Sequence, residues 1–266
     1  MPRKYPPGYI MPGISHALDC HDQPIEVIPI ADLHIGDPHA DMSLIKSLIN
    51  GVRENPNRYT VLCGDLMNTA IIGSKSDTYG ETLRPSEQLE RCADLLEPIK
   101  DKILAIVPGN HEERISRTAG SDMTRLLARE LGLLNVYSDT TALVFLRFGR
   151  EYRHCTPLTY TLYIAHGHGG GRRPGGKINA LQEMSSIIDA DIYIMGHTHM
   201  PAILEQTAYR VVPQKHVAVR RQQLYVNTAS SLTYGGYGRR GGYQPASNRY
   251  PVITLHDKEH MITATL

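Results

Sequence analysis

Five short apolar segments in this chain each end at a cluster of Asp, Asn, Glu or His side chains, and this repeated arrangement restricts the folds available to it. The clearest case is residues 59–63, a run that stops at Gly64 and Asp65. A short apolar run bounded by glycine is typical of a buried strand, so we expect Asp65 at a strand's carboxyl end, where open α/β sheets usually keep their chemistry. The other clusters are Asp32-x-His34, Gly109-Asn110-His111-Glu112, His166-Gly167-His168 and Gly196-His197-x-His199.

The spacing within these clusters favours metal binding. Residues two apart on an extended segment point to the same face, so Asp32 and His34 can grip one ion together. By the same rule, His197 and His199 can both point toward one metal cluster. Mixed Asp, His and Asn ligation suits Mn, Fe, Zn or Ni rather than Ca. Taken singly, Asp65 could simply lead a turn and the His pairs could form a structural zinc site, but five such clusters in order are hard to explain by coincidence.

Composition narrows the class of protein. A chain of 266 residues, 41% hydrophobic and 21% charged, has the size and balance of a soluble globular protein. Its net charge of +1 gives no overall attraction to nucleic acid or membrane, so any basic patch must be local. The four scattered cysteines favour a reduced, cytoplasmic protein over a disulfide scaffold. No segment approaches transmembrane length and the proline-rich start does not look like a signal peptide, so we expect no membrane association.

The order of segments predicts an α/β fold. Residues 1–23, interrupted by Pro and Gly, are expected to form an irregular N-terminal arm, and residues 24–266 one domain. The first half alternates strands with helices and the second half is richer in strands, which favours two sheets with helices outside. The expected strands are residues 26–31, 59–63, 103–107, 141–148, 159–165, 191–195, 224–227, 251–256 and 261–266. The expected helices are one capped by Asp41 and residues 85–97, 121–132 (capped by Ser121) and 177–189, with residues 69–84 a long polar insertion.

The five clusters, in order D-x-H, G-D-x-x-N, G-N-H-E, H-G-H and G-H-x-H, resemble the motifs of the calcineurin-like metallophosphoesterase superfamily. The resemblance spans residues 32–199. It implies a four-layer α-β-β-α sandwich of two mixed sheets flanked by helices, which agrees with the α/β pattern. It also implies a metal-dependent phosphoester hydrolase.

The resemblance further implies a site for two divalent ions bridged by Asp65. A hydroxide bound to both ions would attack phosphorus in line while the ions neutralise charge on the phosphoryl oxygens. His111 resembles the family's catalytic histidine, which protonates the leaving oxygen; the alternative is that it only orients a metal ligand. The implied ligands are Asp32, His34, Asp65 and His199 for the first ion and Asp65, Asn110, His166 and His197 for the second.

One position departs from the pattern of the protein Ser/Thr phosphatases, which have G-D-x-x-D-R-G at the second motif. Here Asn68 replaces the carboxylate that would support the catalytic histidine, and no Arg follows. An amide oxygen can accept a hydrogen bond but stabilises an imidazolium less than a carboxylate does. The departure counts against phosphoprotein phosphatase activity and favours the phosphodiesterase, nuclease and small-phosphoester branches.

Several polar or basic residues near the motifs are candidates for binding substrate. Residues 169–177 combine open glycine backbone with Arg and Lys suited to phosphate, and residues 234–243 interleave Tyr, Gly and Arg that could stack bases and touch phosphates. For both stretches the alternative is a solvated flexible loop. Arg114 is placed to reach phosphate or, alternatively, to pair with Glu112 or Glu113. The candidate substrate-binding residues are Asn68, Arg114, His168, Arg172 and Arg173, of which His168 could instead only support His166.

The sequence therefore predicts an enzyme, a metal-dependent phosphoesterase with two divalent ions (Mn, Fe, Zn or Ni) as cofactors. A phosphodiester is the preferred substrate, and the sharper prediction of a nucleotide or nucleic acid is supported only by the basic segments. The alternatives are a phosphomonoesterase on a small substrate, a structural zinc protein, and a non-catalytic metal-binding scaffold on the same fold. The sequence leaves open a homo-oligomer or an ATPase partner subunit.

Overall fold

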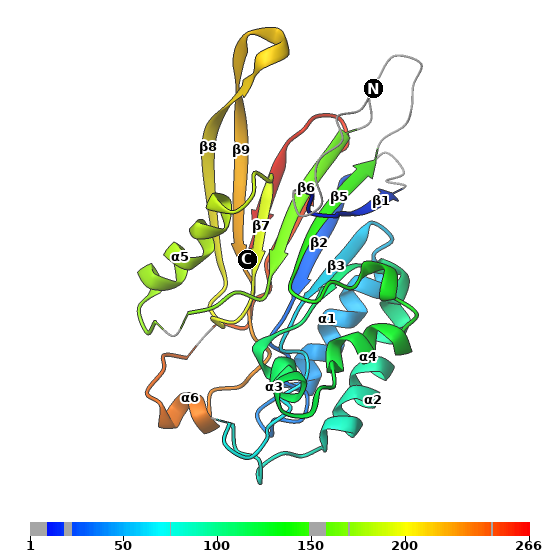
Figure 1. Cartoon of the computed structure of the whole chain (residues 1–266), viewed down its shortest axis with the longest axis vertical. Helices are drawn as coiled ribbons and strands as arrows, with labels where there is room; N and C mark the ends of the chain where they lie inside the picture. Colours follow the sequence, from blue (N-terminus) through cyan, green and yellow to red (C-terminus); the bar gives the residue numbers. More distant parts are fainter. Residues whose placement is uncertain (1–9, 19–22, 75, 149–157, 170, 246) are drawn as a thin grey trace.

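Two mixed β-sheets lie face to face and helices cover their outer faces (Figure 1). The computed structural model describes residues 10–18, 23–74, 76–148, 158–169, 171–245 and 247–266. One sheet has five strands and the other six. A large cluster of buried apolar side chains lies between the sheets and includes Val61 and Ala105 from one sheet and Leu162 and Ile194 from the other. The expected α-β-β-α sandwich is confirmed.

The five-stranded sheet carries the first three strand-end clusters. Its strands are β2 (Ile25–Ile30), β3 (Arg58–Cys63), β4 (Ile103–Val107), β10 (Val252–Leu255) and β11 (Ile262–Thr265). They lie in the order β11-β10-β2-β3-β4, and β2, β3 and β4 are parallel. Every residue of β4 is buried, which explains its continuous apolar sequence. Because parallel strands end at the same edge, the residues that follow β2, β3 and β4 lie close together.

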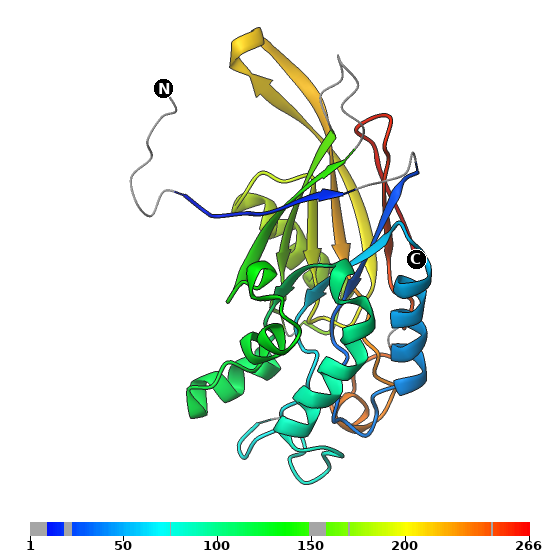
Figure 2. The ribbon, with the colours of Figure 1, turned by 90° about the vertical axis from the view of Figure 1, so that its right-hand side faces the viewer.

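The six-stranded sheet carries the last two clusters. Its strands are β1 (Ile14–Leu18), β5 (Thr141–Phe148), β6 (Leu158–Ala165), β7 (Ile192–Met195), β8 (Ala202–Val212) and β9 (Val217–Asn227). The order is β1-β5-β6-β7-β9-β8, with β6, β7 and β9 parallel. The β8–β9 hairpin projects beyond the other strands in both views (Figures 1 and 2).

Helices α1 (Met42–Glu54), α2 (Pro85–Leu96) and α4 (Met123–Glu130) pack on the five-stranded sheet, and α5 (Pro174–Glu183) packs on the six-stranded sheet. As expected, Asp41 caps α1, and its side chain accepts hydrogen bonds from the backbone N–H of Ser43 and Leu44. The remaining helical elements are α3 (Asn110–Ala119), α6 (Gly236–Arg240) and the 3₁₀ helices η1 (Glu97–Lys102), η2 (Leu134–Val136), η3 (Met184–Ser186) and η4 (Pro213–Lys215). In the part of the chain that the structure describes, none of these helices has the length and apolar character needed to cross a bilayer.

Pro29 lies inside β2, although proline cannot donate to a sheet ladder. The antiparallel neighbour β10 pairs only with residues 25–27 of β2, so Pro29 lies beyond the end of that ladder. Its carbonyl oxygen accepts a hydrogen bond from Thr228 Oγ1 at 2.7 Å. The missing N–H therefore removes no bond to β10.

The structure differs from the expected elements in several places. Strand β1 lies within residues 1–23, for which we expected irregular structure; it pairs with the edge of β5, and its Pro12-Gly13 lead-in hides it in the sequence. Helix α3 was not expected, because it carries few apolar residues. Asp122 rather than Ser121 caps α4, accepting from Arg125 N at 2.8 Å. Helix α5 begins at Pro174 and ends at Glu183, and β8 and most of β9 were missed because much of that hairpin is exposed.

Candidate metal centre

The residues that follow five strands meet at one edge of the sandwich. Gly64 makes the turn after β3 with a φ of 82°, and a Cβ at this position would collide with the backbone of Gly109. The loops after β2 and β3 are tied together, since Asp32 N–H donates to Gly64 O at 3.1 Å. The residues gathered there are Asp32 and His34 after β2, Asp65 after β3, Asn110 and His111 at the start of α3, His166 after β6, and His197 and His199 after β7.

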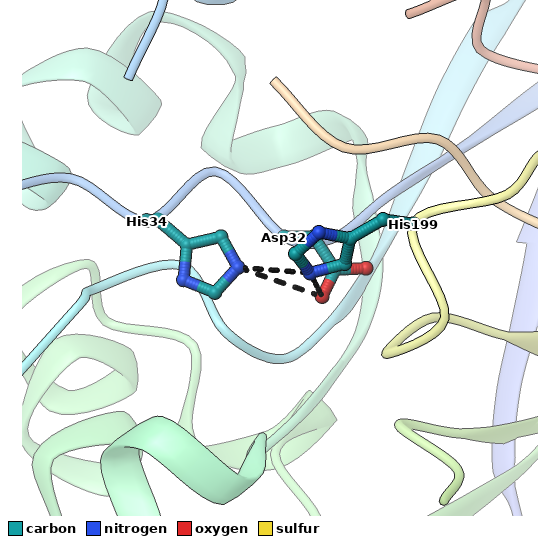
Figure 3. Close-up of side chains that lie close together, drawn as sticks. All are labelled: Asp32, His34 and His199. Atoms are coloured by element: carbon teal, nitrogen blue, oxygen red, sulfur yellow. Dashed lines mark hydrogen bonds and ion pairs between the residues drawn. The ribbon is translucent and has the colours of Figure 1, made fainter. Parts of the chain in front are cut away.

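Asp32, His34 and His199 form a first group that could hold a metal ion, and their side chains point toward one another (Figure 3). The Nε2 atoms of His34 and His199 lie 3.1 Å apart, and Asp32 Oδ1 lies 3.2 Å from His199 Nε2. Two ligands each about 2.1 Å from one ion lie roughly 3.0–3.5 Å apart, so this spacing suits shared coordination. Within the described residues, Asp32 Oδ1 is buried and accepts no hydrogen bond, which fits an atom whose partner is an ion.

Asp65, His166 and His197 form a second group. His166 Nε2 lies 3.2 Å from Asp65 Oδ2 and 3.2 Å from His197 Nδ1. Asn110 Oδ1 lies 2.7 Å from His197 Nδ1 and 3.1 Å from His166 Nε2, so it adds a neutral oxygen to the group. A carboxylate, an amide oxygen and two imidazoles form a mixed donor set that suits a transition-metal ion.

Asp65 also lies beside a third group, with His34 and His111. His111 Nε2 is 3.7 Å from Asp65 Oδ2, and the backbone N–H of His111 donates to Asp65 Oδ1 at 2.8 Å. The His34 and His111 rings meet edge to face with centroids 4.5 Å apart. The Asp65 carboxylate therefore lies between the first and second groups, with His111 next to it.

Backbone carbonyls fix the orientation of two imidazoles. His166 Nδ1 lies 2.7 Å from the carbonyl oxygen of Cys63, and His111 Nδ1 lies 2.8 Å from that of Asn68. A carbonyl oxygen can only accept, so Nδ1 carries the hydrogen in both rings. The Nε2 atoms are thereby directed toward Asp65, one of them available as a ligand and the other as a group that can exchange a proton.

Charge and burial set the protonation states. Although burial opposes it, His166 and His111 hold the pKa of Asp65 well below its usual range. Burial, reinforced by His111 and His199, holds the pKa of His34 well below its usual range. Burial would also lower the pKa of His166, but the Asp65 carboxylate raises it to about 10. An ionised Asp65 thus attracts either a proton or a metal cation at this position, and metal binding must displace that proton.

The backbone at the site takes a conformation that residues other than glycine rarely adopt. Such positive φ angles cost energy and persist only where the surroundings enforce them, which is typical of functional sites. Loop-to-loop hydrogen bonds supply this constraint; His34 N–H, for example, donates to Asp65 O at 3.0 Å. The residues concerned are Asp32 (54°), His34 (49°), Asp65 (51°), His197 (65°) and His199 (53°).

Glu112 stabilises the backbone next to the site. Its buried carboxylate accepts hydrogen bonds from the backbone N–H groups of Asp65, Met67 and Gly109 at 3.0, 2.9 and 2.9 Å. These bonds hold the turn after β3 against the start of α3. Burial, together with nearby Asp65, raises the pKa of Glu112 to about 7. Glu112 belongs to the G-N-H-E motif, but a glutamate at this position could either bind metal or accept backbone hydrogen bonds. The residue type alone does not distinguish these two roles.

Asn68 supports His111 through its backbone rather than its side chain. The Asn68 side chain is buried, and its Nδ2 donates to Glu81 and lies 3.5 Å from Asp37 Oδ2. Glu81 comes from the insertion at residues 69–84, and nothing in that polar stretch indicated its role. Thr69, also in the insertion, donates from its hydroxyl to the carbonyl oxygen of His111. The insertion is thus part of the scaffold that positions His111.

Arg114 is the candidate substrate-binding residue on α3, the helix that begins with Asn110 and His111. It is half-buried, burial lowers its pKa, and its Nη1 donates to Ser76 Oγ in the insertion at 3.0 Å. The alternative partner Glu113 instead pairs with Arg117 at 2.6 Å, and Glu112 is engaged by backbone N–H groups. Arg114 is therefore held between α3 and the insertion.

The other candidates lie at the rim. His168, Arg172 and Arg173 are exposed. Among the residues that the structure covers, His168 belongs to none of the three groups that could hold a metal ion. Arg172 lies over the ring of Tyr243, with 5.6 Å between the guanidinium carbon and the ring centroid. The structure thus brings the two basic stretches of the sequence together.

One protein-family model matches the part of the chain that carries the motifs. A model of the calcineurin-like phosphoesterase family matches residues 33–201. A search of curated proteins found no match. Among solved structures, a variant of Vps29 from Entamoeba histolytica is 14% identical with a TM-score of 0.44 and covers 91% of this chain and 97% of its own. A metallophosphoesterase from Sphaerobacter thermophilus is 16% identical with a TM-score of 0.39 and covers 90% and 87%.

The family model spans more than half of the chain and includes the candidate ligands from His34 to His199. The donor groups found in the structure match the metal dependence of this family. The resemblance that the motifs suggested is therefore confirmed. This chain belongs to the calcineurin-like phosphoesterase family and is a phosphoesterase hydrolase.

Proposed function

We propose that this chain is a two-metal phosphodiesterase. The observation that supports this most strongly is the position of Asp65, whose carboxylate lies 3.2 Å from His166 and 3.7 Å from His111 and belongs to two of the three groups. A single carboxylate can span two ions about 3.5–4 Å apart. Asp32 Oδ1, which is buried and accepts no hydrogen bond within the described residues, supports an ion at the first group.

The donors divide into two sets that share Asp65. When bound, the two ions supply an activated water and neutralise charge on the phosphoryl oxygens. The mixed oxygen and nitrogen donors favour Mn, Fe, Zn or Ni. The proposed ligands are Asp32, His34, Asp65 and His199 for one ion and Asp65, Asn110, His166 and His197 for the other.

His111 is the proposed proton donor to the leaving oxygen. Its Nδ1 hydrogen is engaged by the carbonyl of Asn68, so Nε2 is the atom that takes up or releases a proton. Burial lowers the pKa of His111, while the neighbouring Asp65 carboxylate acts in the opposite direction. The side chain is 14% exposed, which leaves an approach for a substrate oxygen. Proton transfer at this atom contributes roughly 10²–10⁴-fold in comparable enzymes.

The support that His111 receives differs from that in the protein Ser/Thr phosphatase pattern. A main-chain carbonyl stabilises an imidazolium less than the carboxylate of that pattern would. The difference counts against a phosphoprotein substrate and favours the phosphodiesterase, nuclease and small-phosphoester branches. We place the enzyme in the cytoplasm because Cys63 and Cys92 are buried free thiols, which suits a reducing compartment.

Hydrolysis of bis-p-nitrophenyl phosphate against p-nitrophenyl phosphate, with Mn, Fe, Zn or Ni, tests the proposal. We expect metal-dependent turnover that favours the diester and is lost in Asp65→Ala and strongly reduced in His111→Ala. Asp101→Ala, an exposed carboxylate on η1, and His256→Ala, at the end of β10, serve as matched controls with wild-type turnover.

Two results would contradict the proposal. A preference for the monoester would assign a phosphatase instead. No turnover with any of the four metals, despite stoichiometric metal binding, would assign a non-catalytic metal-binding scaffold.

A further inference from the structure

Two basic segments from distant parts of the chain form one surface, which we call the basic rim (residues 171–177 and 234–243). The contact between Arg172 and the Tyr243 ring joins them, and a Cβ on the neighbouring Gly242 would lie 3.8 Å from Arg172 Nη1. A cation over an aromatic face is an attractive contact, so the two segments support each other. The two segments therefore form one continuous surface rather than two separate loops.

The basic rim contacts one loop of the candidate metal centre and the insertion at residues 69–84. Lys177 Nζ donates to the carbonyl oxygen of Thr198 at 2.8 Å, and Thr198 lies between two candidate ligands. At the other end, Arg240 lies 3.8 Å from Asp77 in the insertion that also contacts Arg114. His39 lies against Gly235 and Gly236 at the start of α6. The rim is thus joined directly to the loop that carries His197 and His199.

Charge is concentrated in the basic rim. It contains five cationic residues and no acidic residue, although the whole chain has a net charge of only +1. The arginines of both segments are exposed, and Tyr234 is 52% exposed. Arginine forks bind phosphate oxygens in pairs, and an exposed tyrosine face can stack on a base. The five cations are Arg172, Arg173, Lys177, Arg239 and Arg240.

We propose that the basic rim binds single-stranded nucleic acid and delivers one of its phosphodiesters to the metal centre. This inference rests on the proposed phosphodiesterase function and names its substrate class. The cations are divided between two segments, so they match several phosphates in series rather than the single phosphate of a small ester. A duplex keeps its bases stacked inside, whereas a single strand offers them to Tyr234.

The test measures binding of a fluorescein-labelled, phosphorothioate-substituted dT20 strand to the metal-loaded enzyme at several salt concentrations. Each phosphate contact to a single strand contributes about 0.7 to the slope of log affinity against log salt. We expect Arg172→Ala/Arg239→Ala to lower the affinity at least tenfold at low salt and to make the slope shallower by about 1.4. Tyr234→Ala should lower the affinity at least fivefold without changing the slope.

The matched control is Arg125→Ala/Arg129→Ala, which removes the same charge from exposed positions on α4, across the molecule from α5 and α6 (Figure 1). This control should bind dT20 as the wild type does. Equal loss in both double variants would show only a general charge effect and overturn the inference. So would a wild type that binds phosphatidylserine vesicles but not dT20.

The parent function is tested separately. A wild type that hydrolyses bis-p-nitrophenyl phosphate but does not bind dT20 overturns the nucleic-acid inference alone. A wild type without metal-dependent turnover of that small diester overturns the phosphodiesterase function, whatever the binding result.

Discussion

The Nδ1 atom of His111 lies 2.8 Å from the carbonyl oxygen of Asn68, so a main-chain group fixes the orientation of this imidazole. The same ring directs Nε2 toward Asp65 at 3.7 Å. The position of the ring thus depends on the path of the backbone after β3. That path is in turn held by the carboxylate of Glu112.

If His111 protonates the leaving oxygen, its importance depends on the leaving group. His111→Ala should reduce turnover of an alkyl phosphodiester much more than turnover of bis-p-nitrophenyl phosphate, since p-nitrophenolate leaves without a proton. Steady-state rates for a series of diesters with leaving groups of rising pKa provide the measurement. Equal loss across the series would indicate that His111 only orients its neighbours.

Asn68→Asp should destabilise the fold. The Asn68 amide donates to Glu81 and lies 3.5 Å from Asp37, so an aspartate would place a third carboxylate between two others. We expect a loss of about 1–3 kcal/mol in the free energy of unfolding at neutral pH. Urea unfolding measures the loss, and adding Glu81→Gln should recover part of it. Unchanged stability in Asn68→Asp would contradict this account.

Glu112 should make stability depend on pH. Its pKa is raised to about 7 in the folded protein from an ordinary value of 4.5, so between these values the folded state binds more protons than the unfolded state. Stability should therefore fall as pH rises through this window, by up to about 1.4 kcal/mol per pH unit. Glu112→Gln cannot titrate and should show a flatter dependence, besides a lower overall stability from its lost backbone hydrogen bonds. Urea unfolding between pH 4.5 and 8 compares the two slopes, and identical slopes would rule out this role.

Metal content should follow the division of ligands. Asp32→Ala should lose one of two bound ions, because Asp32 serves the first group alone. Asp65→Ala should lose affinity for both. Elemental analysis after dialysis gives the number of ions per chain, with Asp101→Ala as the control that keeps two. Retention of two tightly bound ions by Asp32→Ala would argue against the assignment.

The left-handed backbone of His199 should make its replacements unequal. Its φ is 53°, and its side chain is 33% exposed, so the side chain itself contributes little packing. Asparagine adopts this conformation readily and valine does not. His199→Val should therefore be less stable than His199→Asn by about 1–2 kcal/mol. Thermal unfolding of the metal-free variants compares them, and equal midpoints would show that the turn relaxes on substitution.

Much of the fold and of the candidate site could be predicted because strand and ligand signals coincide. Strands such as β4 are buried on both faces, so they read as continuous apolar runs. Each apolar segment ends where the chain turns, and a candidate ligand such as Asp65 or His166 follows directly. A short segment of sequence is therefore enough to predict both the strand and the candidate ligand that follows it.

The remainder depended on contacts that local sequence does not record. Helix α3 begins at Asn110 within a motif and has few apolar residues, so no periodic pattern marks it. The role of Glu112 comes from the backbone of Asp65 and Met67, 47 and 45 residues away, and that of Glu81 from the Asn68 side chain across the insertion. The contact between Arg172 and Tyr243 joins segments that only the folded sheet brings together.

Each of the two donor sets draws on both sheets. The first takes Asp32 from the β2 side and His199 from the β7 side, and the second takes Asp65 from the β3 side and His166 from the β6 side. Neither half of the chain alone holds a complete set. A bound ion would therefore link the two sheets of the sandwich. Removing the ion would weaken the packing of one sheet against the other.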